Sequence, residues 1–252
     1  MNVLVCVKRV PETGAKITLT ADEQAIDTAH LGFTISPHEE CAVEEAIRIV
    51  SAHGGTATVL TLGPPAAAEQ LRNAMAMGVE DGVLLETDGS DWDPQATAAA
   101  IVDAVRSLDP APDLLLLGNE SADSGGYQVG IRVAHALDLP CVSGVKAIEI
   151  SDDGLVARRE SGGGWESFAV SLPAVVTVKE GINLPRYPSL PGRLKAKKKE
   201  LRRIEPTRRE GGLRKTRLRV PPDEGGRVEI LGEGADAAPK VVDVLARLGV
   251  LE

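Results

Sequence analysis

The feature that most constrains the fold of this chain is the alternation of short apolar runs with longer amphipathic stretches over its first two thirds. Five of the runs have the length and composition of strands that are buried on both faces. They lie at 3–7, 57–62, 82–85, 114–117 and 174–178. Helices are predicted between them at 37–50, 66–77, 94–108 and 128–137. Alternation of this kind requires right-handed crossovers, so the sequence predicts an α/β fold with a doubly wound, mostly parallel sheet.

The start of the first predicted helix is marked by a capping signal. Ser36, Pro37 and Glu39 form a capping box with proline at the first helical position. Glu44 and Glu45 lie further along the same helix, where a solvated face is the default interpretation for adjacent carboxylates.

Between residues 145 and 171 the pattern changes to short alternating segments joined by turns at 152–154 and 162–164. Such segments are typical of antiparallel strands. They lie at 147–150, 155–159 and 167–170. We therefore expect a small antiparallel extension beside the parallel sheet.

Two regions follow from this reading of the chain. Residues 1–200 are predicted to form the α/β domain, including a recognition loop at 178–200. Beyond residue 200, Pro, Gly, Arg and Glu dominate until an amphipathic helix at 239–248. Because such a composition cannot build its own core, residues 201–252 are expected to form an extended C-terminal arm that lies on a partner subunit or on the main domain.

The recognition loop contains the stretch GINLPRYPSLPGRLKAKKK, from residue 181 to 199. Its three prolines fix φ and disfavour helix in the residues before them, so residues 184–191 are predicted to project as an extended loop with Leu190 at its tip. A short basic helix is predicted after Pro191. The competing interpretation is a surface loop followed by a solvated helix.

Charge is distributed very unevenly along the chain. The segment 186–219 contains 14 of the 28 Lys and Arg residues and three Glu, which leaves 14 basic against 34 acidic residues elsewhere. This asymmetry predicts that the basic segment meets an acidic surface or a polyanion. Nucleic-acid-binding segments usually interleave aromatic residues for stacking, whereas this one has only Tyr187. A protein surface is therefore favoured over nucleic acid.

Several functional classes find no support in the sequence. No apolar run reaches bilayer-spanning length and the opening NVLVCVKRV is typical of a strand, so we expect a cytoplasmic protein without membrane insertion. Cys6, Cys41 and Cys141 share no CxxC spacing and are expected to be buried thiols. The four histidines lack metal-binding spacing, and no nucleophile–base pair stands out. No metal site and no catalytic residue is predicted, which favours a binding or electron-carrier subunit over an enzyme.

A ligand site is nevertheless expected at one edge of the sheet. Ligands of doubly wound sheets bind beyond the carboxyl ends of the strands, where the strand order reverses. The loop after the fourth apolar run reads GNESADSGGYQVG, and its glycines should let backbone amides approach a phosphate at the start of the next helix. These glycines are Gly118, Gly125, Gly126 and Gly130. Since no GxGxxG or P-loop signature is present, a flexible strand–helix connection is the competing interpretation.

Six motifs resemble the β subunits of electron transfer flavoproteins, in the same order along nearly the whole chain. They are VCVKRV, SPHEECAVEEAIRI, AMAMG, the loop 118–130, LPAVVTV and NLPRYPSLPGRLKAKKK, and the resemblance is clearest over residues 1–200. It implies an adenine-nucleotide-hydrolase-like or flavodoxin-like fold and a heterodimer with an α subunit that holds the electron-carrying FAD. It also implies a structural AMP in the β subunit. Electrons would come from acyl-CoA dehydrogenases or related flavoenzymes, as in fatty acid oxidation, and pass to a quinone reductase or another acceptor.

The resemblance also implies roles for individual positions. The AMP pocket would be formed by Cys6, Ser36, Pro37, His38, Glu39, Leu62, Gly118, Asn119, Ala122, Asp123, Ser124, Gly125, Gly126, Tyr127, Gln128 and Val129. Thr13 and His38 match positions that approach the flavin ring from the β side. Partner docking would involve Arg186, Tyr187, Leu190, Lys195, Lys197 and Lys198. Of these, Leu190 matches the leucine that inserts into an apolar pocket of the dehydrogenase.

Two alternatives remain open. The stretch VPET at 10–13 resembles the subgroup that includes nitrogen-fixation-associated and flavin-bifurcating members, in which a second FAD replaces AMP. The stretch SADSGGYQVG matches neither subgroup well. A non-redox adenine-nucleotide-binding module of the universal-stress-protein kind would share the sheet but lack the basic recognition loop.

Overall fold

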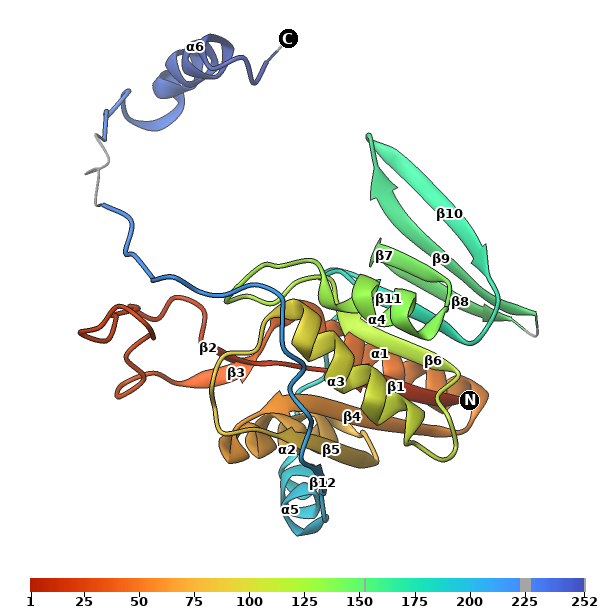
Figure 1. The fold of residues 1–252 in the computed structure, drawn as a ribbon. Coiled ribbons are helices and arrows are strands. Elements are labelled where there is room, and N and C mark those ends of the chain that lie inside the picture. The colour runs from red at the N-terminus through yellow and green to blue at the C-terminus, as the bar shows by residue number, and fades with distance from the viewer. Residues whose placement is uncertain (152, 223–227, 252) are drawn as a thin grey trace.

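The strands of the central sheet are all parallel in the computed structural model, which describes residues 1–151, 153–222 and 228–251 (Figure 1). Seven strands lie in the order β12-β5-β4-β1-β6-β11-β7. Their bounds are β1 (Asn2–Cys6), β4 (Thr56–Gly63), β5 (Asp81–Glu86), β6 (Leu114–Gly118), β7 (Cys141–Val145), β11 (Ala174–Val178) and β12 (Arg202–Ile204). The doubly wound α/β fold expected from the sequence is thus confirmed.

Helices cover both faces of this sheet. They are α1 (Pro37–His53), α2 (Ala68–Met77), α3 (Pro94–Arg106) and α4 (Val129–Leu137), with the short 3-10 turn η1 (Pro65–Ala67) before α2. Two further helices lie outside these layers: α5 (Leu190–Lys198) packs against α2, and α6 (Ala238–Arg247) follows the 3-10 turn η2 (Gly234–Ala237) away from the domain. One apolar cluster joins the sheet to α1 and α2, and a second joins it to α3 and α4. The two faces are therefore covered by consecutive helix pairs.

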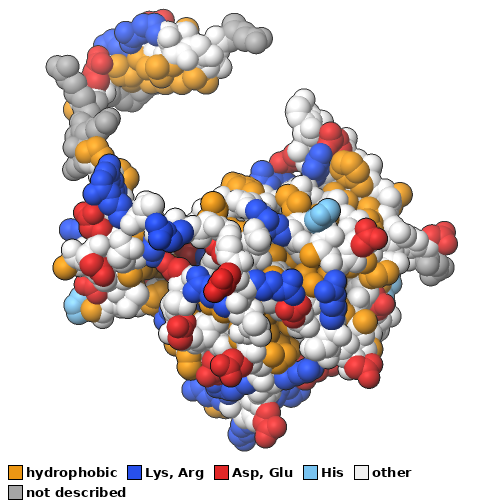
Figure 2. All heavy atoms as spheres, in the orientation of Figure 1, with side chains coloured by type: hydrophobic (Ala, Val, Ile, Leu, Met, Phe, Trp, Pro, Cys, Tyr) orange, Lys and Arg blue, Asp and Glu red, His pale blue; other side chains and the backbone are white. Residues whose placement is uncertain are grey.

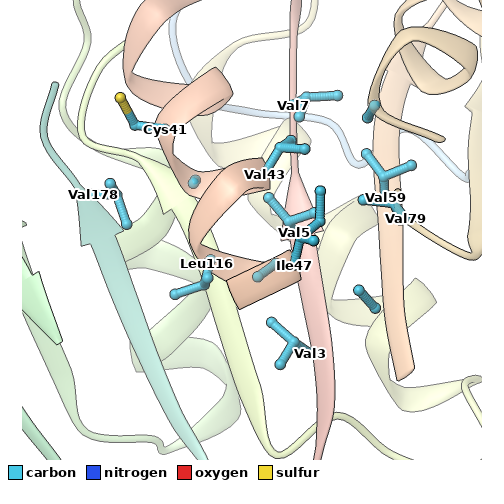
Figure 3. Close-up of a cluster of buried hydrophobic side chains, with 14 of the residues drawn as sticks. Val3, Val5, Val7, Cys41, Val43, Ile47, Val59, Val79, Leu116 and Val178 are labelled. Atoms are coloured by element: carbon cyan, nitrogen blue, oxygen red, sulfur yellow. The ribbon is translucent and has the colours of Figure 1, made fainter. Parts of the chain in front are cut away.

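The central strands are apolar throughout because both of their faces are covered. In β1, Val3 and Val5 belong to the cluster under α1, whereas Leu4 belongs to the cluster on the opposite face. Figure 3 shows Val43 and Ile47 of α1 packed over Val5 and Leu116. Strands with this arrangement read as continuous hydrophobic runs, which is why the five predicted strands are all present.

Two expectations for the first helix were wrong. The helix begins at Pro37 as predicted, but the Ser36 side chain accepts no capping bond from it, and its hydroxyl donates to the carbonyl of Glu120 at 3.4 Å. Glu44 and Glu45 do not lie on a solvated face. Both are buried, and they hold the chain that follows β11, as described below.

Elements with weak sequence signals were not predicted. They are the edge strands β7 and β12 and an antiparallel ribbon formed by β2 (Arg9–Pro11) and β3 (Phe33–Ile35). The predicted antiparallel extension is present as β8 (Ala147–Ser151), β9 (Gly154–Ser161) and β10 (Gly164–Val170), in the order β10-β9-β8. Residue 152 of the first predicted turn lies outside the described residues.

The C-terminal part of the recognition loop differs from the prediction, because its helix begins earlier than expected. α5 begins at Leu190, so this leucine opens a helix instead of standing at the tip of an extended loop. Ser189 caps the helix, since its Oγ accepts the amide of Gly192 at 3.1 Å. Pro191 fits the first helical turn, where its missing N–H has no intrahelical partner.

The C-terminal region begins with a strand of the central sheet and ends with a helix that lies apart from the domain. β12 pairs with β5, so the first residues after 200 extend the sheet and are not part of a free arm. The chain then crosses the domain, and α6 stands apart from it at the upper left of Figure 1. None of the α6 residues is buried. Among the described residues, no helix has the length and apolar character needed to cross a membrane.

Removal of a side chain between the sheet and α1 should destabilise the domain. Leu116 is fully buried in the cluster under this helix, so Leu116→Ala should lower the free energy of unfolding by about 2–5 kcal/mol. Denaturant unfolding of the purified protein measures this loss. Leu190→Ala is the matched control, because Leu190 is 72% exposed and its truncation should leave the unfolding free energy nearly unchanged.

Candidate functional site

The strand order reverses between β1 and β6. The chain passes from β1 to β4 and β5 on one side, and then crosses to β6 on the other side of β1. Cys6 at the end of β1 pairs with Leu117 near the end of β6, so the loops that follow these strands leave the sheet side by side. This is the position at which doubly wound sheets bind ligands.

Lys8 connects the two loops to the start of α1. Its ammonium lies 2.7 Å from the carboxylate of Asp123 and 3.3 Å from the hydroxyl of Ser124, both in the loop after β6. Its backbone amide donates to Glu39 Oε2 at 2.6 Å, in the first turn of α1. Three segments that are distant in sequence therefore meet at one residue.

Glu120 makes a second connection between α1 and the loop after β6. Its carbonyl accepts the hydroxyl of Ser36, and its carboxylate lies 3.7 Å from His38 Nε2. His38 Nδ1 is buried and has no hydrogen-bond partner in the part of the chain that the structure describes. The histidine thus keeps one ring nitrogen available to a further group.

The ionisable groups at this edge are strongly perturbed. Burial raises the pKa of Glu39 to about 8, and the amide of Lys8 opposes this increase only in part. Burial, with the charge of Glu39, raises the pKa of the Cys6 thiol to about 12, so this cysteine is not a nucleophile. Burial also raises the pKa of Asp123, but the nearby Lys8 ammonium outweighs it and holds the pKa below its usual range.

The first turn of α4 offers backbone donors. Gln128 precedes the helix but does not cap it, because its side-chain oxygen accepts two bonds from the Arg132 guanidinium at 3.0 and 3.1 Å. The first amides of a helix have no intrahelical acceptor, and the positive end of the helix dipole lies there. An anion bound at this position would therefore find both donors and a favourable field.

The four glycines of the loop after β6 differ in why a larger residue would not fit there. A Cβ at Gly118 would lie 2.5 Å from Glu39 Cγ, and one at Gly130 would lie 2.5 Å from Thr177 Cγ2. Gly125 has a positive φ of 53°. Gly126 has neither a close neighbour nor a positive φ. Close packing thus explains two of the four glycines that were expected to open the backbone to a phosphate.

Most of the positions predicted to form the pocket lie together at the carboxyl ends of β1 and β6. A few lie at the surface of this edge or away from it. Leu62, at the end of β4, packs against the cluster that contains Cys6. Asn119 is held by the Thr177 hydroxyl, which donates to its Oδ1 at 2.9 Å. Ala122 and Tyr127 are exposed. Thr13 is exposed in the long connection between β2 and β3, and none of its side-chain contacts joins it to this edge among the described residues.

These groups fit a nucleotide phosphate. Uncapped amides and the Lys8 ammonium supply donors at one edge, where the carboxylates are either paired or, at Glu39, protonated near neutral pH. Backbone donors at a helix N-terminus can bind phosphate without a cluster of basic side chains.

A second candidate region, the recognition loop, is attached to the buried carboxylates of α1. Arg186 makes a two-pronged ion pair with Glu44, in which Nε and Nη2 lie 2.8 and 2.9 Å from the carboxylate oxygens. Burial raises the pKa of Glu44, but the Arg186 guanidinium outweighs it and holds the pKa below its usual value. Asn183 donates to Glu45 Oε2 and to the Cys41 carbonyl, both at 2.9 Å. The recognition loop is thus fixed to the domain at two points.

The recognition loop, fixed in this way, exposes several apolar side chains to solvent. Leu184, Tyr187 and Leu190 are 85%, 96% and 72% exposed. α5 follows and packs against α2 through its buried Ala196, while Lys195, Lys197 and Lys198 lie in its last turn. An apolar row beside a basic helix end is a surface suited to a protein partner.

The basic segment meets acidic groups of its own chain. Beyond the Arg186–Glu44 pair, four further ion pairs join it to the domain. They are Arg203–Glu86, Arg209–Asp103, Lys215–Asp91 and Arg217–Glu23. Part of the basic segment is therefore paired within the chain, and its contact with an acidic partner stays a prediction.

The fold defines a doubly wound α/β protein, and its candidate ligand site lies between β1 and β6. Residues 25–208 match the family model described as "Electron transfer flavoprotein domain". The chain is 35% identical to the electron transfer flavoprotein subunit beta of Bacillus subtilis in an alignment of 252 positions that covers 97% of each chain. It is 35% identical to that of Syntrophomonas wolfei, with 96% and 95% covered, and 32% identical to that of Dictyostelium discoideum, with 80% of each covered.

The chain therefore belongs to the electron transfer flavoprotein family, as one of its β subunits. This confirms the resemblance found in the sequence and gives the protein a role in flavin-dependent electron transfer.

Glu39 should make the stability of the protein depend on pH. Its folded pKa of about 8 lies above the ordinary value of 4.5, so the folded state keeps a proton that the unfolded state releases, and stability falls as pH rises between these values. Glu39→Gln keeps an acceptor for the Lys8 amide but cannot titrate. Relative to wild type, its unfolding free energy should therefore rise by on the order of a few kcal/mol over this window.

Urea unfolding at several pH values measures this difference. Glu210→Gln is the control, since Glu210 is exposed in the C-terminal region, and its difference from wild type should stay flat. A flat difference for Glu39→Gln as well would mean that Glu39 is ionised in the folded protein.

Proposed function

We propose that this chain is the β subunit of a heterodimeric electron transfer flavoprotein whose α subunit holds the electron-carrying FAD. In this role it is a carrier and not an enzyme, and it acts in the cytoplasm. Electrons come from acyl-CoA dehydrogenases or related flavoenzymes and pass to a quinone reductase or another acceptor. The observation that carries the proposal is the match to β-subunit relatives over 97% of the chain, which includes both the β1–β6 edge and the recognition loop.

The edge between β1 and β6 is proposed to hold AMP as a structural nucleotide. The amides of Gln128 and Val129 would bind the phosphate, supported by the α4 dipole and by Lys8. His38 Nδ1 and Glu39 would meet polar groups of the nucleotide, since one is an unpartnered buried nitrogen and the other is a carboxyl group protonated near neutral pH. AMP bound here stabilises the fold by mass action and takes no part in electron transfer.

FAD supplies the redox chemistry when it is bound by the α subunit. From the β side, Thr13 and His38 are proposed to approach the flavin ring. His38 suits this role because α1 fixes its backbone and Glu120 lies beside one ring nitrogen. Thr13 lies in an exposed connection, so its position at the flavin would be set by contact with the α subunit.

The recognition loop is proposed to dock the electron donor. Tyr187 and Leu190 supply exposed apolar anchors, and Lys195, Lys197 and Lys198 supply positive charge that would steer an acidic partner. Arg186 is proposed to support docking through its ion pair with Glu44, which fixes the loop on α1.

A count of bound nucleotides tests the cofactor assignment. We expect the complex with the α subunit to release one FAD and one AMP per heterodimer on denaturation, as measured by chromatography. Two FAD and no AMP would support the alternative favoured by the VPET stretch, a flavin-bifurcating subunit. AMP without any flavin would instead support the non-redox nucleotide-binding module.

Truncation of Leu190 tests the docking role. Leu190→Ala should leave flavin content and melting temperature unchanged but slow electron transfer from a dehydrogenase at limiting concentration by roughly thirtyfold, the equivalent of about 2 kcal/mol of docking energy. Stopped-flow reduction of the flavin measures this rate. Leu213→Ala is the control because Leu213 is 70% exposed but lies outside the recognition loop. Equal rates for wild type and Leu190→Ala would exclude Leu190 as an anchor.

A further inference from the structure

The helix that ends the recognition loop, α5, lies against α2 at one end of the molecule (Figure 1). Of its nine residues only Ala196 is buried, while Leu190 and Leu194 are 72% and 55% exposed. An isolated helix of this length is marginal in water, and the burial of a single alanine adds little to its stability. Polar contacts with the domain must therefore hold α5 in place.

One of these contacts is made by Arg72, on α2. Its Nη1 donates to the carbonyl of Ala196 at 2.5 Å and to the carbonyl of Lys199 at 3.2 Å. Both acceptors lie at the C-terminal end of α5. At this end the last carbonyls of a helix lack intrahelical donors, and the negative end of the helix dipole favours a cation. Arg72 therefore caps α5 from a neighbouring helix.

Two further contacts attach α5 to the same part of the domain. A Cβ at Gly192 would lie 2.5 Å from the carbonyl oxygen of Ala76, so the first turn of α5 packs directly on the last turn of α2. At the other end, the Lys199 ammonium donates to the carbonyl of Glu80, in the connection between α2 and β5. The helix is thus fixed at both of its ends.

The lysines in the last turn of α5 take no part in this cap. Lysines near a helix C-terminus can bond to the last carbonyls of their own helix. Here Arg72 occupies two carbonyls at this end, and Lys195, Lys197 and Lys198 are exposed without a hydrogen bond or ion pair in the described part of the chain. In Figure 2, Lys and Arg side chains gather at the bottom of the view, where α5 lies. Their charge is therefore available to another molecule.

We propose that Arg72 is a positioning residue for docking. By capping α5 from α2, it holds the helix in one orientation and leaves Lys195, Lys197 and Lys198 free to contact an acidic surface of the electron donor. This role rests on the docking function proposed for the recognition loop. It differs from the role of Arg186, which fixes the start of the loop on α1, whereas Arg72 fixes its end on α2.

Hydrogen exchange of the heterodimer with its α subunit tests the cap itself. Arg72→Met keeps an apolar side chain of similar length but removes the donors, so the amides of α5 should exchange severalfold faster while those of β4 and β6 keep their rates. Arg106→Met is the matched control, because Arg106 Nη2 donates at 3.0 Å to the carbonyl of Ala136, in the last turn of α4. Its loss should leave α5 unchanged. Equal exchange of α5 in wild type and Arg72→Met would overturn the cap.

Steady-state reduction of the heterodimer by a dehydrogenase tests the positioning role. Arg72→Met should raise the KM of the dehydrogenase for the heterodimer roughly three- to tenfold at low salt and leave kcat nearly unchanged, because only docking is affected. This increase should shrink as NaCl rises from about 0.02 M to about 0.3 M, since counter-ions screen the lysines. Arg72→Lys keeps the charge but not the planar guanidinium, so it should restore the KM only in part. Arg106→Met should retain the wild-type KM.

Leu190→Ala separates failure of this inference from failure of the proposed function. It should raise the KM at every salt concentration, because counter-ions do not screen an apolar anchor. A raised KM for Leu190→Ala with a wild-type KM for Arg72→Met would overturn the role of Arg72 and leave the docking function standing. A wild-type KM for both variants would overturn the docking function and the inference together. Equal increases for Arg72→Met and Arg106→Met would show a general loss of stability and would also exclude a specific role of Arg72.

Discussion

The parallel pairing of β1 with β4 on one side and β6 on the other is the constraint on which the rest of the structure depends. It buries β1 on both faces and places its carboxyl end next to that of β6. Lys8 then emerges between the first turn of α1 and the loop before α4, where it bonds to Glu39 and Asp123. The ligand edge is therefore a product of the strand order, and its electrostatics follow from the burial that this order imposes.

Two kinds of ion pair join the basic segment 186–219 to the α/β domain. The Arg186–Glu44 pair has a buried carboxylate that would be costly to leave unpaired, so it fixes the recognition loop. The pairs Arg209–Asp103 and Arg217–Glu23 are exposed on both sides and contribute little to stability. Within one basic segment, Arg186 thus pairs with a buried carboxylate, whereas Arg209 and Arg217 pair with exposed ones.

Most of the α/β domain could be predicted from the sequence, because buried parallel strands and amphipathic helices leave periodic apolar patterns. The five predicted strands and four predicted helices are present with shifts of one or two residues at most of their ends. The three-residue edge strand β12 was not predicted, because an edge strand this short needs little apolar patterning. Pro191 predicted a later start for α5 than the structure has, since proline is also compatible with a first helical turn.

The sequence by itself determined the fold class and the family, because these depend on local patterns and on motifs that are continuous in the chain. Only the tertiary structure decided what the charged residues do. Glu44 and Glu45 have the local pattern of a solvated helix face, yet residues more than a hundred positions away bury and pair them. Whether the basic segment contacts a partner or its own domain depends in the same way on distances between remote residues, because an ion pair requires proximity in space and leaves no periodic signal in the sequence.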